Sequence, residues 1–218
     1  MNTLKNKIDF AVVINVKNAN PNGDPLNGNR PRTDYDGIGE ITDVCIKRKL
    51  RDRLLEHGQA IFVQSNDRKI DKEPSLQKRA ENTLKQAYGS ARMAEEACKQ
   101  WFDVRAFGQL FAFKKTGKKG KDSDGSESDG DTGVSTAIRG PVTIQSAFSK
   151  EPVNITSTQI TKSVSGEGDG SKRGSDTMGM KHRVDRGIYV FYGSMNPQLA
   201  ERTGFSDEDA EVIKNLLP

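Results

Sequence analysis

The sequence has few of the residues that would build a disulfide framework, a membrane span or an aromatic-rich core. Only two of its 218 residues are cysteines, Cys45 and Cys98, and they lie far apart without metal-type spacing. This pattern argues against a disulfide scaffold and favours small buried thiols in a reducing compartment. The N-terminal segment has too short an apolar run for a signal peptide or a membrane span. We therefore expect a cytoplasmic protein with no membrane partner.

Apolar side chains are also scarce, at 33% of the residues, and aromatic side chains make up 6%. The core is therefore modest, and much of the chain must be polar surface or loop. The formal net charge is only +4, so the total charge says little about partners. The basic character is local, because residues 42–57 carry five Lys/Arg against three Asp/Glu. A segment of this kind suits contact with a nucleic-acid backbone.

The segment 18–53 is the most informative part of the chain. Residues 8–16 alternate between apolar and mostly polar positions, which predicts a strand with one apolar face. A loop rich in Asn, Gly and Pro follows over 18–41, and its length favours a functional role. A helix is predicted over 42–57, with Thr42 as N-cap and Gly58 at its end. Its free backbone N–H groups and partial positive charge suit an anion.

The rest of the chain gives a mixed pattern of strands and helices. Strands are predicted at 61–63, 103–111, 140–148 and 187–193, and helices at 75–101, with a break near Gly89, and at 206–217. Residues 114–133 are of low complexity and predicted to be disordered, and 150–186 form a second polar excursion. The Asp/Gly text in 114–133 lacks the spacing of a calcium loop, so we expect no metal site.

This order of elements predicts an α+β fold that approximates the βαββαβ core of ferredoxin-like and RRM-like domains. The closing strand of that core is missing, because the chain stops at Pro218. Either the strand is supplied elsewhere or this chain is a shortened form.

Candidate binding residues fall first in the loop and the helix that follows it. The loop offers amides, a hydroxyl and arginines that can contact phosphate and ribose: Asn20, Asn22, Arg30, Arg32 and Thr33. The alternative is a set of turn residues with solvated arginines. On the helix, Lys47, Arg48 and Arg51 can share one face, and the alternative is a solvated charged face. Arg105 and Arg139 flank strand ends, where each either contacts RNA or pairs with an acidic neighbour.

Seven motifs together resemble one known family. They occur in the order NANPNGDPLNGNRPRTD, ITDVCIKRKLRD, WFDVRAFGQLF, IRGPVTIQSAFS, ITKS, DTMGMKHRV and TGFSDED. The series is similar to the Cas7-type (Csd family) backbone subunits of type I-C Cascade surveillance complexes, and the resemblance runs from about residue 8 to residue 217. Seven motifs in a fixed order are far more specific than a single Gly-rich loop.

The resemblance implies an RRM-like palm with finger and thumb insertions in a single domain, 1–218. It assigns 18–41 to an RNA-contacting loop, 58–102 to a helical finger and 150–186 to a thumb. Members of the family polymerise along CRISPR guide RNA with other copies of themselves and other Cascade subunits. Target DNA then pairs with the exposed guide, so that base pairing reads the sequence. The resemblance implies a binding protein with no cofactor and no catalytic residues.

The thumb candidates depend mainly on this resemblance. They are basic side chains together with one apolar side chain that can act as a wedge between bases: Lys162, Lys172, Arg173, Met178, Lys181 and Arg183. The alternative is a disordered surface loop. Most of the scattered aromatic residues are expected in the core, so we do not expect the base-stacking sheet of a conventional RRM.

Two other functions compete with a guide-RNA backbone. The first is a metal-dependent ribonuclease that uses a loop carboxylate, with Asp24, Asp34 and Asp36 as candidates. Asp is common in such turn-rich sequence for structural reasons. The second is a stand-alone RRM-like regulator, which would bind RNA tightly and sequence-specifically as a monomer.

Overall fold

The computed structural model describes residues 2–113, 134–161 and 178–217. Contacts divide the chain into two compact units. The sheet unit comprises Phe10–Arg48 and Ile144–Gly193, and the helical unit comprises Met1–Asp9, Lys49–Thr143 and Ser194–Pro218. The boundary falls within helix α1 (Asp43–Glu56). The RRM-like palm and the single domain remain predictions.

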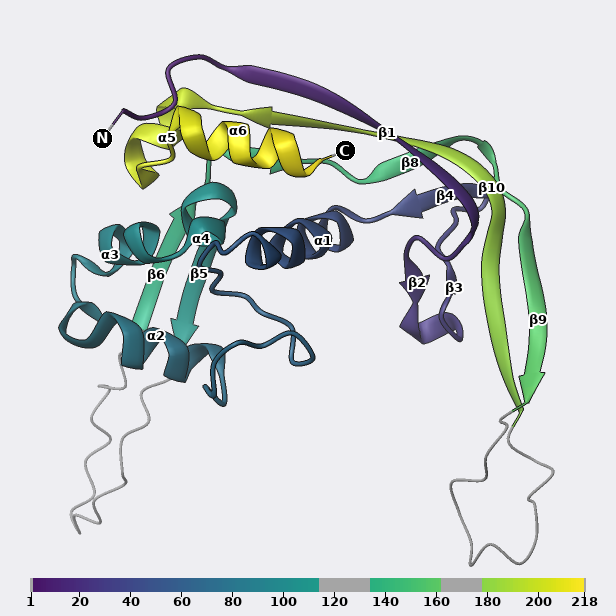
Figure 1. Cartoon of the computed structure of the whole chain (residues 1–218), viewed down its shortest axis with the longest axis horizontal. Coiled ribbons are helices and arrows are strands. Elements are labelled where there is room, and N and C mark those ends of the chain that lie inside the picture. The colour runs from purple at the N-terminus through teal and green to yellow at the C-terminus, as the bar shows by residue number, and fades with distance from the viewer. Residues whose placement is uncertain (1, 114–133, 162–177, 218) are drawn as a thin grey trace, which may run out of the picture. The chain divides into compact units, whose positions relative to one another are not determined.

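The sheet unit is built around four neighbouring strands in the order β1-β10-β8-β4 (Figure 1). Their bounds are Ile8–Ala19 for β1, Met178–Met195 for β10, Ala147–Pro152 for β8 and Ile38–Ile41 for β4. The β10·β8 and β4·β8 pairs are antiparallel. The long β10 also pairs with β9 (Ile155–Thr161) in an antiparallel hairpin. A short ribbon of β2 (Gly23–Asp24) and β3 (Arg30–Pro31) flanks the 3-10 helix η1 (Pro25–Asn27).

One face of this sheet is the core of the unit. The predicted alternation of β1 is confirmed, because its apolar positions are more buried than their neighbours and Val16 is buried. The ring of Phe10 meets that of Phe191 edge-on at 6.4 Å. Gly193 leaves room for this ring, since a Cβ there would overlap Phe10. Tyr189 is fully buried on the same side of β10.

The helical unit packs helices on a two-stranded ribbon. Its helices are α2 (Leu76–Leu84), α3 (Met93–Gln100), α4 (Phe102–Phe107), α5 (Pro197–Thr203), α6 (Asp207–Leu216) and the 3-10 helix η2 (Lys85–Ala87). The ribbon pairs β5 (Gly108–Phe113) with β6 (Val134–Arg139). The ring of Phe62 lies 4.6 Å from that of Trp101 and 5.1 Å from that of Phe111 in the core. The predicted helical region with a break near Gly89 is confirmed.

One predicted strand was wrong, and a second was right only over its last part. Residues 61–63 form no strand, because Phe62 N and Val63 N donate to the carboxylate of Asp103 at 2.7 and 3.1 Å. The carboxylate thus provides the hydrogen-bond acceptors that a neighbouring strand would otherwise supply. Residues 103–111 begin as α4, which ends at Gly108 with φ +81°, and only then continue as β5.

Other boundaries differ from the prediction for local reasons. The predicted strand 140–148 is two strands, β7 (Val142–Ile144) and β8. The polar excursion 150–186 contains β9 and the first part of β10, so strand 187–193 is the end of a longer one. The last helix starts as predicted at its Ser206 cap. The predicted loop 114–133 lies outside the described residues.

Candidate nucleic-acid interface

The loop of the sheet unit is tied to the start of α1 by one side chain. Asn22 Oδ1 accepts hydrogen bonds from both Thr42 N and Thr42 Oγ1 at 2.9 Å. Thr42 Oγ1 in turn accepts from Cys45 N at 3.3 Å, as an N-cap does. Asn22 is therefore occupied within the protein, and it fixes where the loop meets the helix. Ser146 Oγ accepts from Asp43 N at 3.2 Å, which links the same turn to the segment before β8.

The rest of the loop is held by its own polar side chains. Asp24 Oδ1 accepts from Leu26 N at 3.1 Å and from Arg32 Nη2 at 3.3 Å. Asn20 Nδ2 donates to Asn29 O at 2.7 Å, while Asn20 Oδ1 is buried without a hydrogen-bond partner among the described residues. The loop is thus an ordered platform, although its sequence suggested a string of turns. Arg30 is half-buried beside it, and Thr33 is exposed.

Asp34 organises the second half of the loop. Its Oδ1 accepts from Asp36 N at 3.0 Å and from Ile38 N at 2.8 Å, which leads the chain into β4. Two of the three carboxylates considered for catalysis, Asp24 and Asp34, therefore stabilise backbone turns. Within the described residues, no group of three or more His, Cys, Asp or Glu side chains could hold a metal ion.

The three candidate basic residues of α1, Lys47, Arg48 and Arg51, are divided between the two units and have different surroundings. Lys47 Nζ lies 2.9 Å from Asp43 Oδ2, a pair that is partly open to solvent. Arg48 is half-buried in the same unit. Arg51 belongs to the helical unit, where its Nε lies 3.0 Å from Asp103 Oδ2 and its guanidinium 5.2 Å from the centre of the Phe107 ring. Arg51 therefore balances a buried carboxylate.

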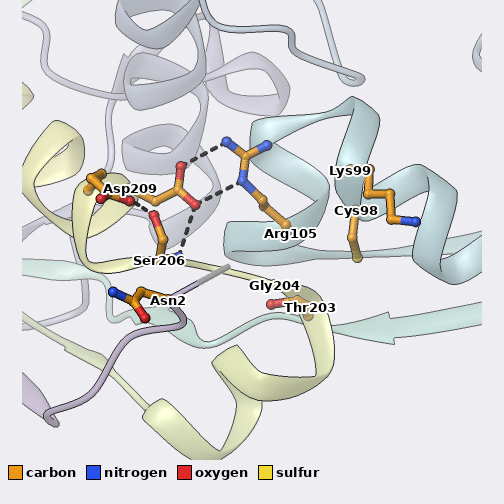
Figure 2. A pocket seen from close by; sticks show the side chains of 9 residues that line it. Asn2, Cys98, Lys99, Arg105, Thr203, Gly204, Ser206 and Asp209 are labelled. Atoms are coloured by element: carbon orange, nitrogen blue, oxygen red, sulfur yellow. Dashed lines mark hydrogen bonds and ion pairs between the residues drawn. The ribbon is translucent and has the colours of Figure 1, made fainter.

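Arg105 is also engaged within the helical unit, as Figure 2 shows. Its Nε and Nη2 donate to the two oxygens of Asp209 at 2.9 and 2.7 Å. The same carboxylate accepts from Ser206 N in the capping box of α6. The acidic partner foreseen as the alternative for Arg105 thus exists. Arg139 is exposed at the end of β6, opposite Gly108 in the ribbon.

The β9/β10 hairpin carries the thumb candidates that lie within the described residues. Met178 is 62% exposed, and Met180 on the same side of the strand is 53% exposed. Lys181 and Arg183 point to the opposite side, where Arg183 Nε lies 3.7 Å from Asp185 Oδ1. The hairpin therefore has one side with methionines and one side with cations. Lys162, Lys172 and Arg173 lie outside the described residues.

Neither cysteine has the surroundings of a reactive thiol site. Cys98 is buried, and burial raises the pKa of its thiol to about 11. Cys45 is half-buried and donates to Pro21 O at 3.7 Å. No helix in the described segments is long and apolar enough to cross a membrane.

Comparison with known proteins identifies the family. The model of the family described as CRISPR-associated protein Cas7 matches residues 6–218. The chain belongs to the Cas7 family. A curated Cas7 protein from Haloferax volcanii is 32% identical over 221 residues, which cover 98% of this chain and 64% of that protein. The chain thus spans about two thirds of the length of that relative, and the type I-C subtype remains a prediction.

A solved structure shares the fold of this Cas7-family chain. It belongs to a protein described as "CRISPR RNA-guided surveillance complex, pre-nicking". The TM-score is 0.55 at 15% identity, with coverage of 97% of this chain and 69% of the other. At this identity the likeness concerns the fold alone, and it supports a mixed α/β architecture.

Two exposed aromatic side chains on the sheet of this Cas7-family chain were not predicted from its sequence. Phe148 is 48% exposed and Tyr192 is 58% exposed, on neighbouring strands β8 and β10. Strict alternation along the single strand predicted at 140–148 would put Phe148 on the same face as Val142 and Ile144, which are buried. Alternation changes phase between β7 and β8, so Ala147 and Ser149 are buried and Phe148 turns outward. The sequence 140–148 reads as one continuous alternating strand, so it does not reveal the change of phase between β7 and β8.

Proposed function

We propose that this chain is a non-catalytic subunit that binds CRISPR guide RNA and forms the backbone of a type I-C surveillance complex. The observation that carries the proposal is membership of the Cas7 family over nearly the whole chain. The ordered loop and the first turn of α1 support it, because they present amides and cations from a fixed scaffold. Binding reads the RNA backbone, and base pairing with target DNA reads its sequence.

Pre-organisation of the loop is the physical basis of this binding. Asn22, Asp24 and Asp34 hold the loop before any RNA arrives, so little conformational entropy is lost on binding. Arg30, Lys47 and Arg48 then supply positive charge in the same unit. Contacts of this kind go to phosphate and ribose and carry no sequence information.

Each copy binds a short RNA segment weakly, and assembly provides the affinity. Successive copies along one guide would contact each other through two different surfaces, which gives an open helical row. Once one copy is bound, the next meets the same RNA at a high effective concentration. The β9/β10 hairpin acts as the thumb, with Met178 available as the apolar wedge. Other Cascade subunits complete the complex.

The ribonuclease alternative has little support from the loop carboxylates. Asp24 and Asp34 both accept backbone hydrogen bonds, so their removal would loosen the loop even in a protein without catalytic activity. Asp36 is the cleaner test, because its side chain is exposed. If Mg²⁺-dependent cleavage of target RNA by an assembled complex is lost in Asp36→Ala, the chain is an enzyme and the proposal is wrong.

The phosphate contacts are tested by the salt dependence of RNA binding. Each single-strand phosphate contact contributes about 0.7 to the slope of log K against log salt. Lys47→Ala should weaken binding for all sequences and lower the slope by about this amount. Lys49→Ala, which removes an exposed lysine two residues further along the helix, is the matched control. Weaker binding of Lys47→Ala with an unchanged slope would show that Lys47 makes no direct phosphate contact.

A further inference from the structure

A hollow on the exposed face of strands β8 and β10 has the chemistry of a nucleotide site. It has a volume of about 390 Å³ and is lined by side chains of β8 and β10 and of the segment before β8, including Phe148, Tyr192, Lys150, Gln145 and Ser146. Two half-exposed aromatic rings thus share one hollow with an amide, a hydroxyl and a cation. Exposed rings on an open sheet are the feature by which RRM-type domains stack RNA bases.

The strand register explains why these groups meet. Phe148 lies opposite Val190 in the antiparallel ladder, and Tyr192 follows two residues after Val190 on β10, so the Phe148 and Tyr192 rings point to the same face. Gln145 N donates to Tyr192 O at 2.9 Å and fixes the segment before β8 beside β10. The two rings are therefore diagonal neighbours on a rigid backbone. Little order has to be created when a ligand binds.

The charge of the hollow favours an anion. Among the described residues that line it, Lys150 is the one charged side chain. A second hollow of about 400 Å³ adjoins the first through Lys150 and adds Arg186, Glu151 and the half-exposed Ile188. Glu40, opposite Phe148 on the neighbouring strand β4, points to the same face of the sheet as the rings. Lys150 and Arg186 thus extend positive charge along the sheet from the two rings, where the backbone of a bound single-stranded nucleic acid could follow it.

The hollow is also continuous with the proposed interface. Ser146, which lines it, accepts a hydrogen bond from Asp43 N in the first turn of α1. The same turn is held by Asn22 of the loop. A single-stranded RNA that contacts the loop and the start of α1 can therefore reach the aromatic hollow within the sheet unit.

We propose that this hollow holds an unpaired nucleotide of single-stranded RNA, with its base stacked on Tyr192 and Phe148 and its phosphate at Lys150. This inference rests on the proposed RNA-binding function and adds a base-stacking site to it. Gln145 and Ser146 can contact the ribose or a base edge. Since every base has a stacking face, the site tolerates any sequence.

Ring-specific variants of the whole chain test the proposal with fluorescent oligouridylate that carries one 2-aminopurine. Tyr192→Leu and Phe148→Leu should each weaken binding about tenfold, because a base–aromatic stack is lost. Tyr192→Phe keeps the ring and should bind like the parent protein. Val13→Ala shortens another exposed apolar side chain, outside the hollow, and should also bind normally. Quenching of 2-aminopurine on binding should be lost only in the leucine variants.

The outcomes separate this inference from the proposed function. If the parent chain binds no RNA, the proposed function fails and this inference fails with it. If the parent binds and Lys47→Ala weakens binding, but both leucine variants bind and quench normally, only the stacking site is wrong. If the leucine variants lose self-association without RNA and keep their affinity per protomer, the face contacts a second copy, and the proposal is overturned.

Discussion

At the scale of single residues, two carboxylates decide what the neighbouring arginines do. Asp103 is 1% exposed and accepts from two backbone N–H groups as well as from Arg51. Asp209 is bound by Arg105 through both oxygens and caps α6. Sequence alone shows only that basic residues are present. Whether an arginine faces RNA or a buried acid depends on contacts between residues 52 and 104 positions apart in the chain.

The first prediction concerns Arg51. Replacing it in Arg51→Met leaves the Asp103 carboxylate buried without its cation, which costs about 3 kcal/mol of unfolding free energy. Lys49→Met removes an exposed cation two residues away and should change stability by less than about 0.5 kcal/mol. Urea unfolding of both variants measures the difference. Equal stabilities would mean that the Arg51–Asp103 pair is unimportant.

Asn22 gives a second prediction at this scale. Asn22→Ala leaves the backbone N–H of Thr42 and its hydroxyl without their acceptor and should cost about 1–2 kcal/mol. Asn27→Ala, at an exposed position of the same loop, is the control. Hydrogen exchange of the first turn of α1 should accelerate in the Asn22 variant alone. Unchanged exchange would show that the loop does not depend on this link.

The third prediction is a pH dependence. Arg79, which is 4% exposed, donates to both oxygens of Asp71 at 2.6 and 2.8 Å and holds the pKa of this carboxyl below its ordinary value of 3.8. A lowered pKa in the folded state contributes stability above the unfolded pKa, and this contribution is lost as the pH falls through the folded pKa. Asp71→Asn should therefore flatten the loss of stability below about pH 4. An identical acid profile for parent and variant would contradict the role of this pair.

At the scale of elements, sequence patterns predicted most pieces whose signal is local. The strand at β1, the helix α1, the helical region with its break and the Ser206 cap all follow from alternation, capping residues and glycine. The strand predicted at 61–63 is absent because Asp103 accepts hydrogen bonds from its backbone, and the strand predicted at 103–111 forms only from Gly108 on, because α4 occupies its first part. Helix α5 was missed, although Asn196 followed by Pro197 is a start signal that the sequence carries.

A glycine contact between elements gives the fourth prediction. A Cβ at Gly140 would overlap backbone atoms of Ala106, Phe107 and Gly108, where the end of α4 and the start of β5 approach the residue after β6. Backbone cannot move aside cheaply, so Gly140→Ala should destabilise the protein by about 3 kcal/mol. Gly179→Ala in β10 makes only ordinary contact with Ile160 and should be tolerated. Thermal unfolding compares the two, and equal midpoints would contradict the close approach.

The candidate site divides in the same way between local and distant causes. The loop and the start of α1 could be found from sequence, because Asn, Gly and Pro mark the loop and Thr42 marks the cap. The internal roles of Asn22 and Asp24 could not, since each depends on a partner chosen by the fold. The exposed rings of Phe148 and Tyr192 depend on the phase of two strands, and no local pattern reports it.

At the scale of the whole molecule, the proposed RNA-binding groups lie in one of the two units. The sheet unit holds the loop, Lys47, Arg48, the hairpin and the aromatic hollow, whereas Arg51 and Arg105 stabilise the helical unit. This division explains why a net charge of only +4 is compatible with RNA binding. Many of the cations are paired with acids, and the cations proposed to bind RNA, Lys47 and Arg48 among them, lie in the sheet unit.

The most direct test of the central claim is binding of the purified chain to single-stranded RNAs of increasing length, with the mass of each complex measured. The account predicts weak binding to short RNAs, little preference for sequence, and complexes whose mass grows with RNA length. Strict one-to-one binding at every length, with affinity that depends on sequence, would contradict it. That result would favour a stand-alone RNA-binding protein.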